Sequence, residues 1–341
     1  MEQYLKLCNT PVEKEKLYFS KKNKTPKVSI ISPVYNRDKY LSRFLKSIWY
    51  QQFNDIEIVL IDDFSSDNSL NLIKLYKNLD KRIQLIQNKK NYGTFKSRNL
   101  GILASKGEYA ILPDPDDIFS QNSLRMFYNY AVKYDYEMLR FNMYFGNNNI
   151  FLSHVVNHFS NRPVFQPELK TFSYYASGIC GCNDYNVANK FIKRLTLIKA
   201  LNLLEKEYLN IYMITYEDQL LNFILYRIAK SFSFLKKIGY YYIINPQSIV
   251  KNECNSNDIK NIFINLKIIF DYSKNNKYEK DMFNSFFEES VIAKSIINRT
   301  HLMNNDKKYY IDAIDIFSKN DFISFNCKDY MVQMKKKINE T

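Results

Sequence analysis

Apolar segments of strand length alternate with amphipathic segments of helix length between residues 28 and 112, and this alternation restricts the fold more than any other feature. The apolar runs predict strands at 28–31, 56–61, 83–86 and 109–112. Apolar residues at helical spacing predict helices over 41–49, 68–78 and 94–104. Strands that alternate with helices of about ten to fifteen residues are typical of a parallel, doubly wound sheet. We expect Pro33 to end the first strand.

The second half of the chain is less regular. It predicts helices at 124–134, 190–204 and 217–230, strands at 138–144 and 240–244, and an irregular stretch over 146–186. From about residue 252 the apolar spacing is helical again. The expected fold is therefore α/β, with a mostly parallel central sheet flanked by helices. We expect a basic leader over 1–26, a main domain over 27–250 with halves that meet near residue 125, and a helical C-terminal region over 251–341.

The composition indicates an ordered globular protein. Of 341 residues 46% are hydrophobic, and no apolar run reaches the eighteen or so residues of a membrane-spanning helix. Five cysteines, an odd number, and an N-terminus without a secretory signal profile favour a reducing, cytoplasmic setting. The net charge of +14 is spread along the chain without a nucleic-acid motif, which favours a solvated surface over a nucleic-acid partner. Peripheral association with an anionic membrane surface stays an alternative.

Three carboxylates crowd together in Pro113-Asp-Pro-Asp-Asp117, directly after the apolar run 109–112. Carboxylates this close repel one another unless a cation or donor groups offset the repulsion. Ligands of open α/β sheets bind beyond the carboxyl ends of the strands, where this cluster lies. Hard oxygen ligands suit Mn²⁺ or Mg²⁺, with substrate phosphates completing the coordination. The segment therefore predicts a metal and phosphate site, and its alternative is a simple turn.

Glycine is scarce, yet Gly93, Gly101 and Gly107 lie within fifteen residues of one another. Such a group indicates places where the backbone turns tightly or approaches another segment closely. Lys96 and Arg98 lie among these glycines and can meet a phosphate or a carboxylate. The alternative is a helix start with two exposed cations.

Two acidic residues follow the second predicted strand with different expected roles. Asp67, with Ser66, is best explained as a cap of the following helix. Asp63 lies closer to the strand end, where a carboxylate can accept from a base or a sugar hydroxyl. Turn chemistry explains Asp63 equally well.

Taken together, these segments resemble family 2 glycosyltransferases, which have a GT-A fold. The resemblance is dense over 27–125 and looser to about 250, and five motifs occur in the family's order and spacing. They are Val28-Ser-Ile-Ile-Ser-Pro-Val-Tyr-Asn36, Asp62-Asp-Phe-Ser-Ser-Asp67, Asn91-Tyr-Gly with Ser97-Arg-Asn-Leu-Gly101, Gly107-Glu-Tyr109, and Leu112-Pro-Asp-Pro-Asp-Asp117. The resemblance implies that 27–125 binds a nucleotide-sugar and that 126–250 forms the acceptor half.

The resemblance also implies roles for individual residues. It implies that Pro33, Tyr35 and Asn36 bind the nucleotide-sugar, with the ring of Tyr35 packing on the base, and that Asp63 receives the ring N–H. Arg98, with Lys96 beside it, lies near the nucleotide. The residues of the DxD site for ribose and metal are Asp114 and Asp116, with Asp117 as a further candidate ligand; which of the three contacts the metal stays open.

A second acidic pair, Glu217-Asp218, occurs in the other half of the chain. It resembles the pair that opens a helix in the family, whose aspartate is the general base of inverting members. That role requires a carboxylate within reach of the acceptor hydroxyl. The alternative is that both acids complement a helix N-terminus. Asn189-Lys190 likewise resembles an Asn-Lys signature of the family, without a defined role.

The resulting prediction is a metal-dependent, inverting glycosyltransferase. It would move a sugar from a nucleotide-sugar, a UDP-sugar first of all, to a hydroxyl of a glycan, lipid-linked or protein acceptor. The alternatives are an inactive nucleotide- or glycan-binding protein and a nucleotidyltransferase, which would release pyrophosphate. A zinc site at His154, His158, Cys180 and Cys182 is not expected, because the cysteine spacing is wrong for the usual pairs.

Overall fold

The structure is a computed structural model. It describes residues 25–146, 151–154, 164–165, 186–206, 208–243, 255–273, 280, 283–284, 287–288, 291, 296, 303, 306–321 and 323–340. The chain divides into two compact units. Unit 1 comprises Met1–Gln166, Asn186–Tyr212 and Ile228–Pro246, and unit 2 comprises Pro167–Tyr185, Met213–Arg227 and Gln247–Thr341.

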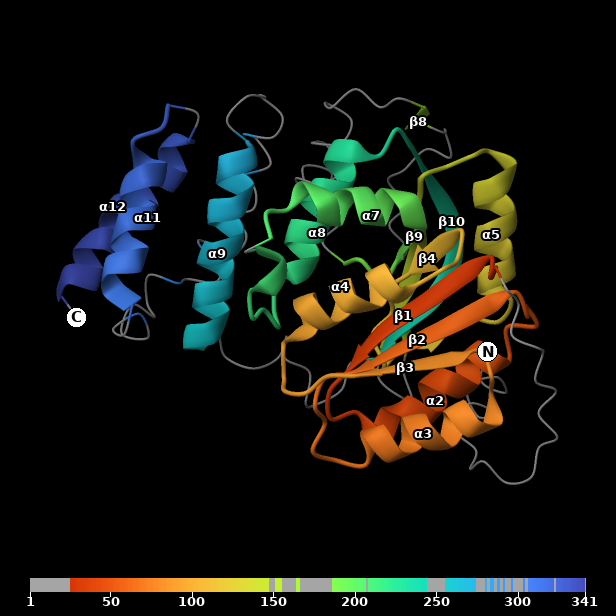
Figure 1. Ribbon diagram of the computed structural model, residues 1–341. Helices are drawn as coiled ribbons and strands as arrows, with labels where there is room; N and C mark the ends of the chain where they lie inside the picture. Colours follow the sequence, from red (N-terminus) through yellow and green to blue (C-terminus); the bar gives the residue numbers. More distant parts are fainter. Residues whose placement is uncertain are drawn as a thin grey trace. The chain divides into compact units, whose positions relative to one another are not determined.

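The described part of unit 1 is built on one mixed sheet with the strand order β3-β2-β1-β4-β9-β6-β10-β5 (Figure 1). Strands β1 to β4 form a parallel block, β9 runs antiparallel to both of its neighbours, and β10 is parallel to β6. The strands are β1 (Val28–Val34), β2 (Ile56–Asp62), β3 (Ile83–Gln87), β4 (Tyr109–Ile111), β5 (Ile118–Phe119), β6 (Met138–Gly146), β9 (Lys190–Lys193) and β10 (Ser231–Ile243). Two short strands, β7 (Phe151–His154) and β8 (Val164–Phe165), pair with β6 and β10.

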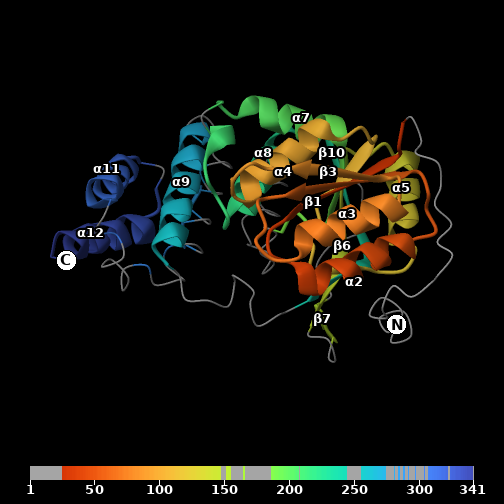
Figure 2. The ribbon, with the colours of Figure 1, turned by 60° about the horizontal axis from the view of Figure 1, so that its bottom comes forward.

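Helices cover both faces of the parallel block. Figures 1 and 2 show α2 (Asp38–Trp49) and α3 (Ser69–Leu79) on one face and α4 (Thr94–Ala104) on the other. Helix α5 (Ser123–Lys133) contributes to the same core as α2 and α3, whereas α7 (Arg194–Leu203) packs against α4. The expected α/β fold with a mostly parallel sheet between helices is therefore confirmed.

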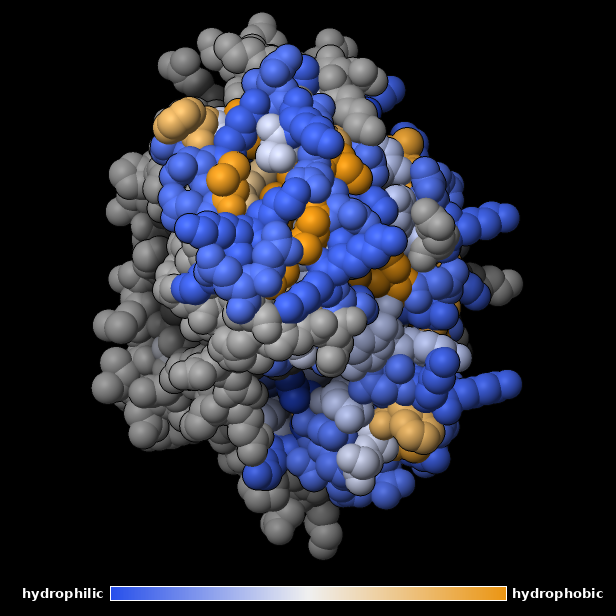
Figure 3. Space-filling model, turned by 90° about the vertical axis from the view of Figure 1, so that its left-hand side faces the viewer, coloured by the Kyte–Doolittle hydropathy of each residue, from blue (hydrophilic) through white to orange (hydrophobic). Residues whose placement is uncertain are grey.

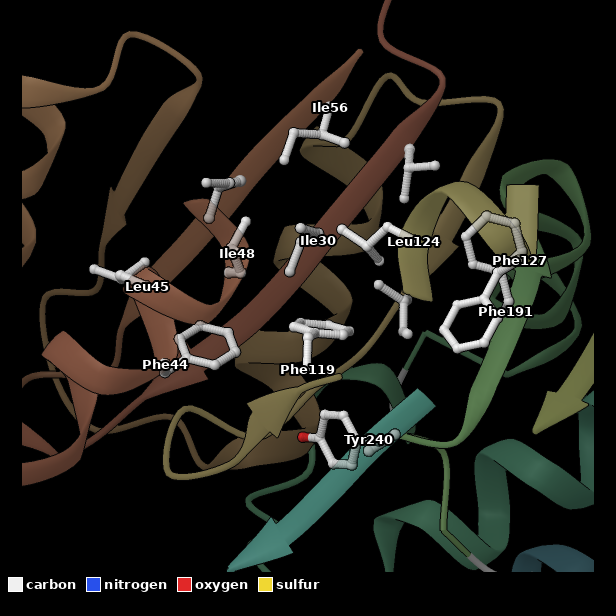
Figure 4. Packing of buried hydrophobic residues seen from close by; sticks show 14 of the residues in the cluster. Ile30, Phe44, Leu45, Ile48, Ile56, Phe119, Leu124, Phe127, Phe191 and Tyr240 are labelled. Carbon is white, nitrogen blue, oxygen red and sulfur yellow. The ribbon is translucent and has the colours of Figure 1, made fainter. Parts of the chain in front are cut away.

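The core under α2 and α5 follows from the alternation of side chains along the strands. Val28 and Ile30 of β1 point to this face and are completely buried. Figure 4 shows the aromatic and aliphatic side chains that meet them from other elements: Phe44, Leu45 and Ile48 of α2, Phe119 of β5, Leu124 and Phe127 of α5, Phe191 of β9 and Tyr240 of β10. A core assembled from so many elements holds the strand ends of unit 1 in fixed positions.

The first strand is longer than expected, because Pro33 lies inside β1 rather than at its end. Val28 N donates to Asp55, and the carbonyl oxygen of Val34 accepts from Asp63, so both groups face β2. The backbone nitrogen of Pro33 therefore faces the opposite side, where β4 has already ended. A missing N–H costs nothing there, and the strand continues to Val34.

The strand β9 was not expected from the sequence, which predicted a helix from residue 190. The first four residues of that stretch pair with β4 and β6 as a strand, and the helix begins at Arg194. Phe191 and Ile192 are completely buried. Strands β4 and β6, which are far apart in the chain, both gain hydrogen-bond partners through this segment. The local spacing of apolar residues does not reveal such long-range pairing.

The glycines expected at tight turns or close approaches are found there. Gly93 has φ 84° immediately before α4, a conformation that favours glycine. A Cβ on Gly101 would contact Ile31 and would lie 2.6 Å from Cδ1 of Ile61, so α4 lies directly against β1 and β2. A Cβ on Gly107 would lie 2.5 Å from the hydroxyl of Ser29.

The described part of unit 2 is helical, which confirms the expected helical C-terminal region. Its helices are α8 (Glu217–Ile228), α9 (Ser256–Tyr272), α11 (Lys307–Ser318) and α12 (Phe325–Glu340). Asn255 and Asp258 form a capping box at the start of α9, and Phe263, Phe270, Tyr310 and Phe317 join α9 to α11 through ring contacts. In Figure 3, hydrophilic residues predominate on the face shown, with apolar residues among them. No helix in the described ranges is long and apolar enough to cross a membrane.

Candidate nucleotide-sugar site

Three groups of functional residues predicted in the first half of the chain follow neighbouring parallel strands of unit 1. Tyr35 follows β1, Asp63 follows β2, and Asp114 to Asp117 follow β4. Because β2, β1 and β4 are adjacent and parallel, their carboxyl ends lie at one edge of the sheet (Figure 1). The structure thus places these segments at the edge where open α/β sheets bind ligands.

The turn after β1 presents Tyr35 to the solvent. Its side chain is 45% exposed. The next residue, Asn36, has φ 51°, and its Oδ1 accepts from Ser66 N at 2.8 Å. Asn36 N in turn donates to Ser65 Oγ at 3.2 Å. Asn36 is therefore a structural residue that ties the β1 turn to the β2 turn and leaves the Tyr35 ring available.

Asp67 accepts hydrogen bonds from the starts of two helices at this edge. Its Oδ1 accepts from Ser69 N at 2.9 Å at the start of α3, as the capping prediction requires. Its Oδ2 accepts from Asp38 N at 3.0 Å at the start of α2. Burial favours the neutral acid, but the hydrogen bonds from Ser69 and Asp38 prevail and lower the pKa of Asp67.

Asp63 holds the loop that leads into α4. Its side chain is 3% exposed. Oδ1 accepts from Asn88 Nδ2 and Tyr92 N, both at 2.8 Å, and Oδ2 accepts from Gly93 N at 2.8 Å. A carboxylate has about four acceptor positions, so one position on Oδ2 is not taken by the described residues. Asp63 therefore holds the distant loop 88–93 rather than its own turn, and its contact with a base stays a prediction.

Each of the first two aspartates after β4 faces an arginine. Nη2 of Arg98, a side chain of α4 that is 2% exposed, lies 3.4 Å from Oδ1 of Asp114. Nε of Arg37, which precedes α2, lies 3.4 Å from Oδ2 of Asp116. The backbone oxygen of Asp116 also accepts from Arg43 at 2.9 Å. Three arginines from two helices and the β1 turn therefore surround this segment and offset the repulsion between its carboxylates.

Asp117 differs from its two neighbours. Its side chain is 1% exposed, and Oδ1 accepts from Ile243 N of β10 at 2.8 Å. Tyr240 of the same strand accepts from Asp114 N at 3.0 Å through its hydroxyl. Burial, with the charges of Asp116 and Asp114, raises the pKa of Asp117 well above its usual range. Asp117 thus anchors the segment to β10.

Lys96 lies on α4, and its Nζ is 4.3 Å from the centre of the Tyr92 ring, a cation–π contact. Tyr92 N donates to Asp63, so Lys96 contacts the same loop that Asp63 binds. Its proposed contact with a phosphate stays a prediction.

Sequence reasoning missed Arg37, Arg43, Tyr212 and Tyr240. Arg37 could have been found, because it follows Tyr35 and Asn36 directly. Tyr212 had no such signal: it follows η1 (Tyr208–Asn210), which packs against α4, and its side chain is 47% exposed. Burial, with the charges of Asp63 and Tyr35, raises the pKa of Tyr212.

Asp218 belongs to unit 2, where it lies in the first turn of α8 beside Glu217. Its charge suits a helix N-terminus, and its role as a base stays a prediction. Lys190 of the Asn-Lys pair is fully buried, and its Nζ donates to the backbone oxygen of Asn186 at 2.6 Å and to Oδ1 of Asn189 at 3.2 Å. This pair therefore has a structural role in the turn before β9. The zinc alternative concerns side chains outside the described residues.

The donor set at the β4 end fits a divalent cation that shares its coordination with a substrate. Within the described ranges, no three His, Cys, Asp or Glu side chains are grouped to hold a metal. Asp114 and Asp116 supply two carboxylates, 36% and 15% exposed. In many phosphate sites, Mg²⁺ is bound by one or two carboxylates together with phosphate oxygens.

Comparison with known proteins agrees with this arrangement. Residues 29–194 match the model of Glycosyl transferase family 2. The glycosyltransferase GlyG of Streptococcus pneumoniae is 32% identical over 117 residues, which are 34% of this chain and 39% of that protein. TarP of Staphylococcus aureus, a poly(ribitol-phosphate) beta-N-acetylglucosaminyltransferase, is 40% identical over 110 residues, which are 31% of this chain and 33% of that protein. The chain thus matches less than half the length of these curated relatives.

Solved structures extend the likeness beyond the matched segment. The crystal structure of Staphylococcus aureus TarS in complex with UDP has a TM-score of 0.65 at 18% sequence identity, over 92% of this chain and 88% of that chain. The complex of TarS with UDP-GlcNAc gives 0.66 at 17% over the same shares. At such identity the likeness shows the fold. The five motifs and the match over residues 29–194 show that the chain resembles glycosyl transferase family 2, and the solved structures show the same GT-A fold.

Proposed function

We propose that this protein is a metal-dependent, inverting glycosyltransferase that moves a sugar from a UDP-sugar to a hydroxyl of a glycan, lipid-linked or protein acceptor. The observation that carries the proposal is the pairing of Asp114 with Arg98 and of Asp116 with Arg37, at the sheet edge where Tyr35 is exposed. An aromatic surface, hard oxygen ligands and cations are the groups that a nucleoside diphosphate requires. The name of TarP and the UDP-GlcNAc complex of TarS make UDP-GlcNAc the first donor to test.

The donor would be held by residues of unit 1. Tyr35 stacks on the base, and the remaining acceptor position of Asp63 receives the ring N–H. Arg98 carries a positive charge toward the diphosphate from a fixed position, because its side chain is buried on α4.

Asp114 and Asp116 would hold Mn²⁺ or Mg²⁺, because their carboxylates are partly exposed. Asp117 is assigned a structural role instead, because it is buried and bound to Ile243. When bound, the metal supplies positive charge to the departing diphosphate.

Asp218 would act as the general base. Its carboxylate takes the proton of the acceptor hydroxyl, whose oxygen attacks the anomeric carbon from the face opposite UDP. The C–O bond to the acceptor forms as the bond to the diphosphate breaks, so the configuration inverts. Positioned bases contribute about 10²- to 10⁴-fold to such rates.

The test is UDP release from a panel of UDP-sugars with Mn²⁺, using Asp116→Asn, Asp218→Asn and the control Asp135→Asn on an exposed carboxylate. We expect the first two substitutions to lower turnover by about a hundredfold or more, and the control to leave it unchanged. Near-normal turnover of Asp218→Asn at saturating donor would refute the base assignment. Pyrophosphate in place of UDP would identify a nucleotidyltransferase, and UDP binding without release of any sugar would identify a binding protein.

A further inference from the structure

The two arginines that face carboxylates of the DPD segment, Asp114 to Asp116, are held in different ways. Arg98 is 2% exposed and projects from the middle of α4. Arg37 is 26% exposed and lies in the β1–α2 turn. The two ion pairs have the same length of 3.4 Å. Arg37 therefore has the freedom to exchange partners that buried Arg98 lacks.

The guanidinium of Arg37 is fixed along one side only. Its Nη1 donates to the backbone oxygens of Tyr35 and Asn36, both at 3.1 Å. Its backbone N–H donates to Ser69 Oγ at 2.7 Å, which fixes the start of the side chain. Nε faces Asp116, and Nη2 donates to none of the described residues. The two N–H groups of Nη2 therefore remain available next to the N–H of Nε. A planar guanidinium with such donors is well suited to bind phosphate oxygens.

The carboxylate of Asp116 carries one negative charge, so it cannot neutralise both Arg37 and a metal ion. A metal that binds Asp116 competes with Arg37, because the carboxylate oxygen that faces Nε is also a candidate ligand atom. If the metal arrives together with a diphosphate, the guanidinium gains a new anion within reach of its side chain. If Asp116 then binds the metal and Arg37 binds the diphosphate, each of these charged groups keeps a partner of opposite charge.

We propose that Arg37 is a diphosphate-binding residue that forms an ion pair with Asp116 in the enzyme without ligands and pairs with the donor diphosphate instead when metal and donor bind. This inference rests on the proposed function, because it requires a nucleoside diphosphate and a divalent cation at the DPD segment. It assigns Arg37 opposite effects on two ligands: it weakens binding of the metal alone and strengthens binding of the metal with UDP.

The test uses wild type, Arg37→Gln, Arg37→Lys and the control Lys39→Gln, which makes the same change of charge at an exposed position on α2. Electron paramagnetic resonance gives the affinity for Mn²⁺ alone, and calorimetry gives the affinity for UDP at saturating Mn²⁺. For Arg37→Gln we expect Mn²⁺ alone to bind about two- to fivefold tighter, since a partly exposed competing ion pair is lost. We expect UDP to bind about tenfold or more weakly, since charge-assisted hydrogen bonds are lost.

The conservative variant Arg37→Lys separates this role from a structural one. Arg37→Lys keeps the charge and loses the planar fork, so Mn²⁺ affinity stays near wild type while UDP affinity recovers only in part. If Arg37→Gln weakens both ligands, or leaves both unchanged, the inference is wrong although the proposed function stands. If wild type binds neither Mn²⁺ nor UDP, the proposed function fails as well.

Discussion

Replacing Asp63 by Asn tests whether this carboxylate organises the nucleotide loop. The side chain accepts three hydrogen bonds at 2.8 Å while only 3% exposed. The amide of Asn keeps one acceptor oxygen and turns its NH₂ group toward Gly93 N or toward the Asn88 and Tyr92 donors. At least one buried N–H then faces another donor. Leaving a buried donor without its charged acceptor costs about 2 to 3 kcal/mol.

Hydrogen exchange of the peptide 88–95, followed by mass spectrometry, measures this cost at the loop itself. A loss of about 2 to 3 kcal/mol corresponds to exchange about 30- to 150-fold faster at the Tyr92 and Gly93 amides, if they exchange through local opening. The affinity for UDP should fall in the same variant, because the loop and the base contact share one carboxylate.

The control is Asp135→Asn, which removes the same charge at a side chain that is 84% exposed and should leave the peptide unchanged. Exchange within about threefold of wild type in Asp63→Asn would refute the reasoning that the carboxylate holds the loop. Unchanged exchange with weakened UDP binding would instead show that Asp63 serves the ligand alone.

Three further predictions concern packing, a helix cap and a thiol. Gly101→Ala should lower the free energy of unfolding by about 1 to 3 kcal/mol, because the new Cβ meets Ile31 and Ile61; stabilisation in urea unfolding would contradict this close packing. Asp67→Asn should destabilise the protein at neutral pH. Because the folded-state pKa of Asp67 is lowered from 3.8, the difference from wild type should shrink as the pH falls below about 4, and a difference independent of pH would count against the capping role. Burial raises the pKa of Cys327 to about 11, so Cys327→Ser should reduce the thiols that Ellman's reagent labels at pH 8 in denaturant, but not in native buffer.

The site shows why some residues could be predicted and others could not. Asp63 and Asp114 each follow an apolar strand, so their place at the carboxyl edge follows from the local pattern. The partners of these acids come from other elements. Arg37 meets Asp116, and Tyr240 of β10 meets Asp114, only because the sheet order brings their segments together. No spacing in the sequence encodes those pairs.

The three aspartates after β4 illustrate the same limit. The sequence offers them as equivalent candidates for a metal. Burial and the bond to Ile243 separate Asp117 from the partly exposed Asp114 and Asp116. Solvent exposure depends on β10, a strand from a distant part of the chain, and therefore belongs to the tertiary structure.

The sequence by itself determined the α/β class, the family resemblance and the segments that form the carboxyl edge of the sheet. These features depend on periodicity and on turn residues within a few positions of each other, which a sequence records directly. Tertiary structure decided that Pro33 lies within β1, that β9 is a strand between β4 and β6, and which arginine faces which aspartate. Those outcomes depend on strand pairing and close packing between segments far apart in the chain. The energy of a residue there depends on neighbours that cannot be identified from the residues next to it in the sequence.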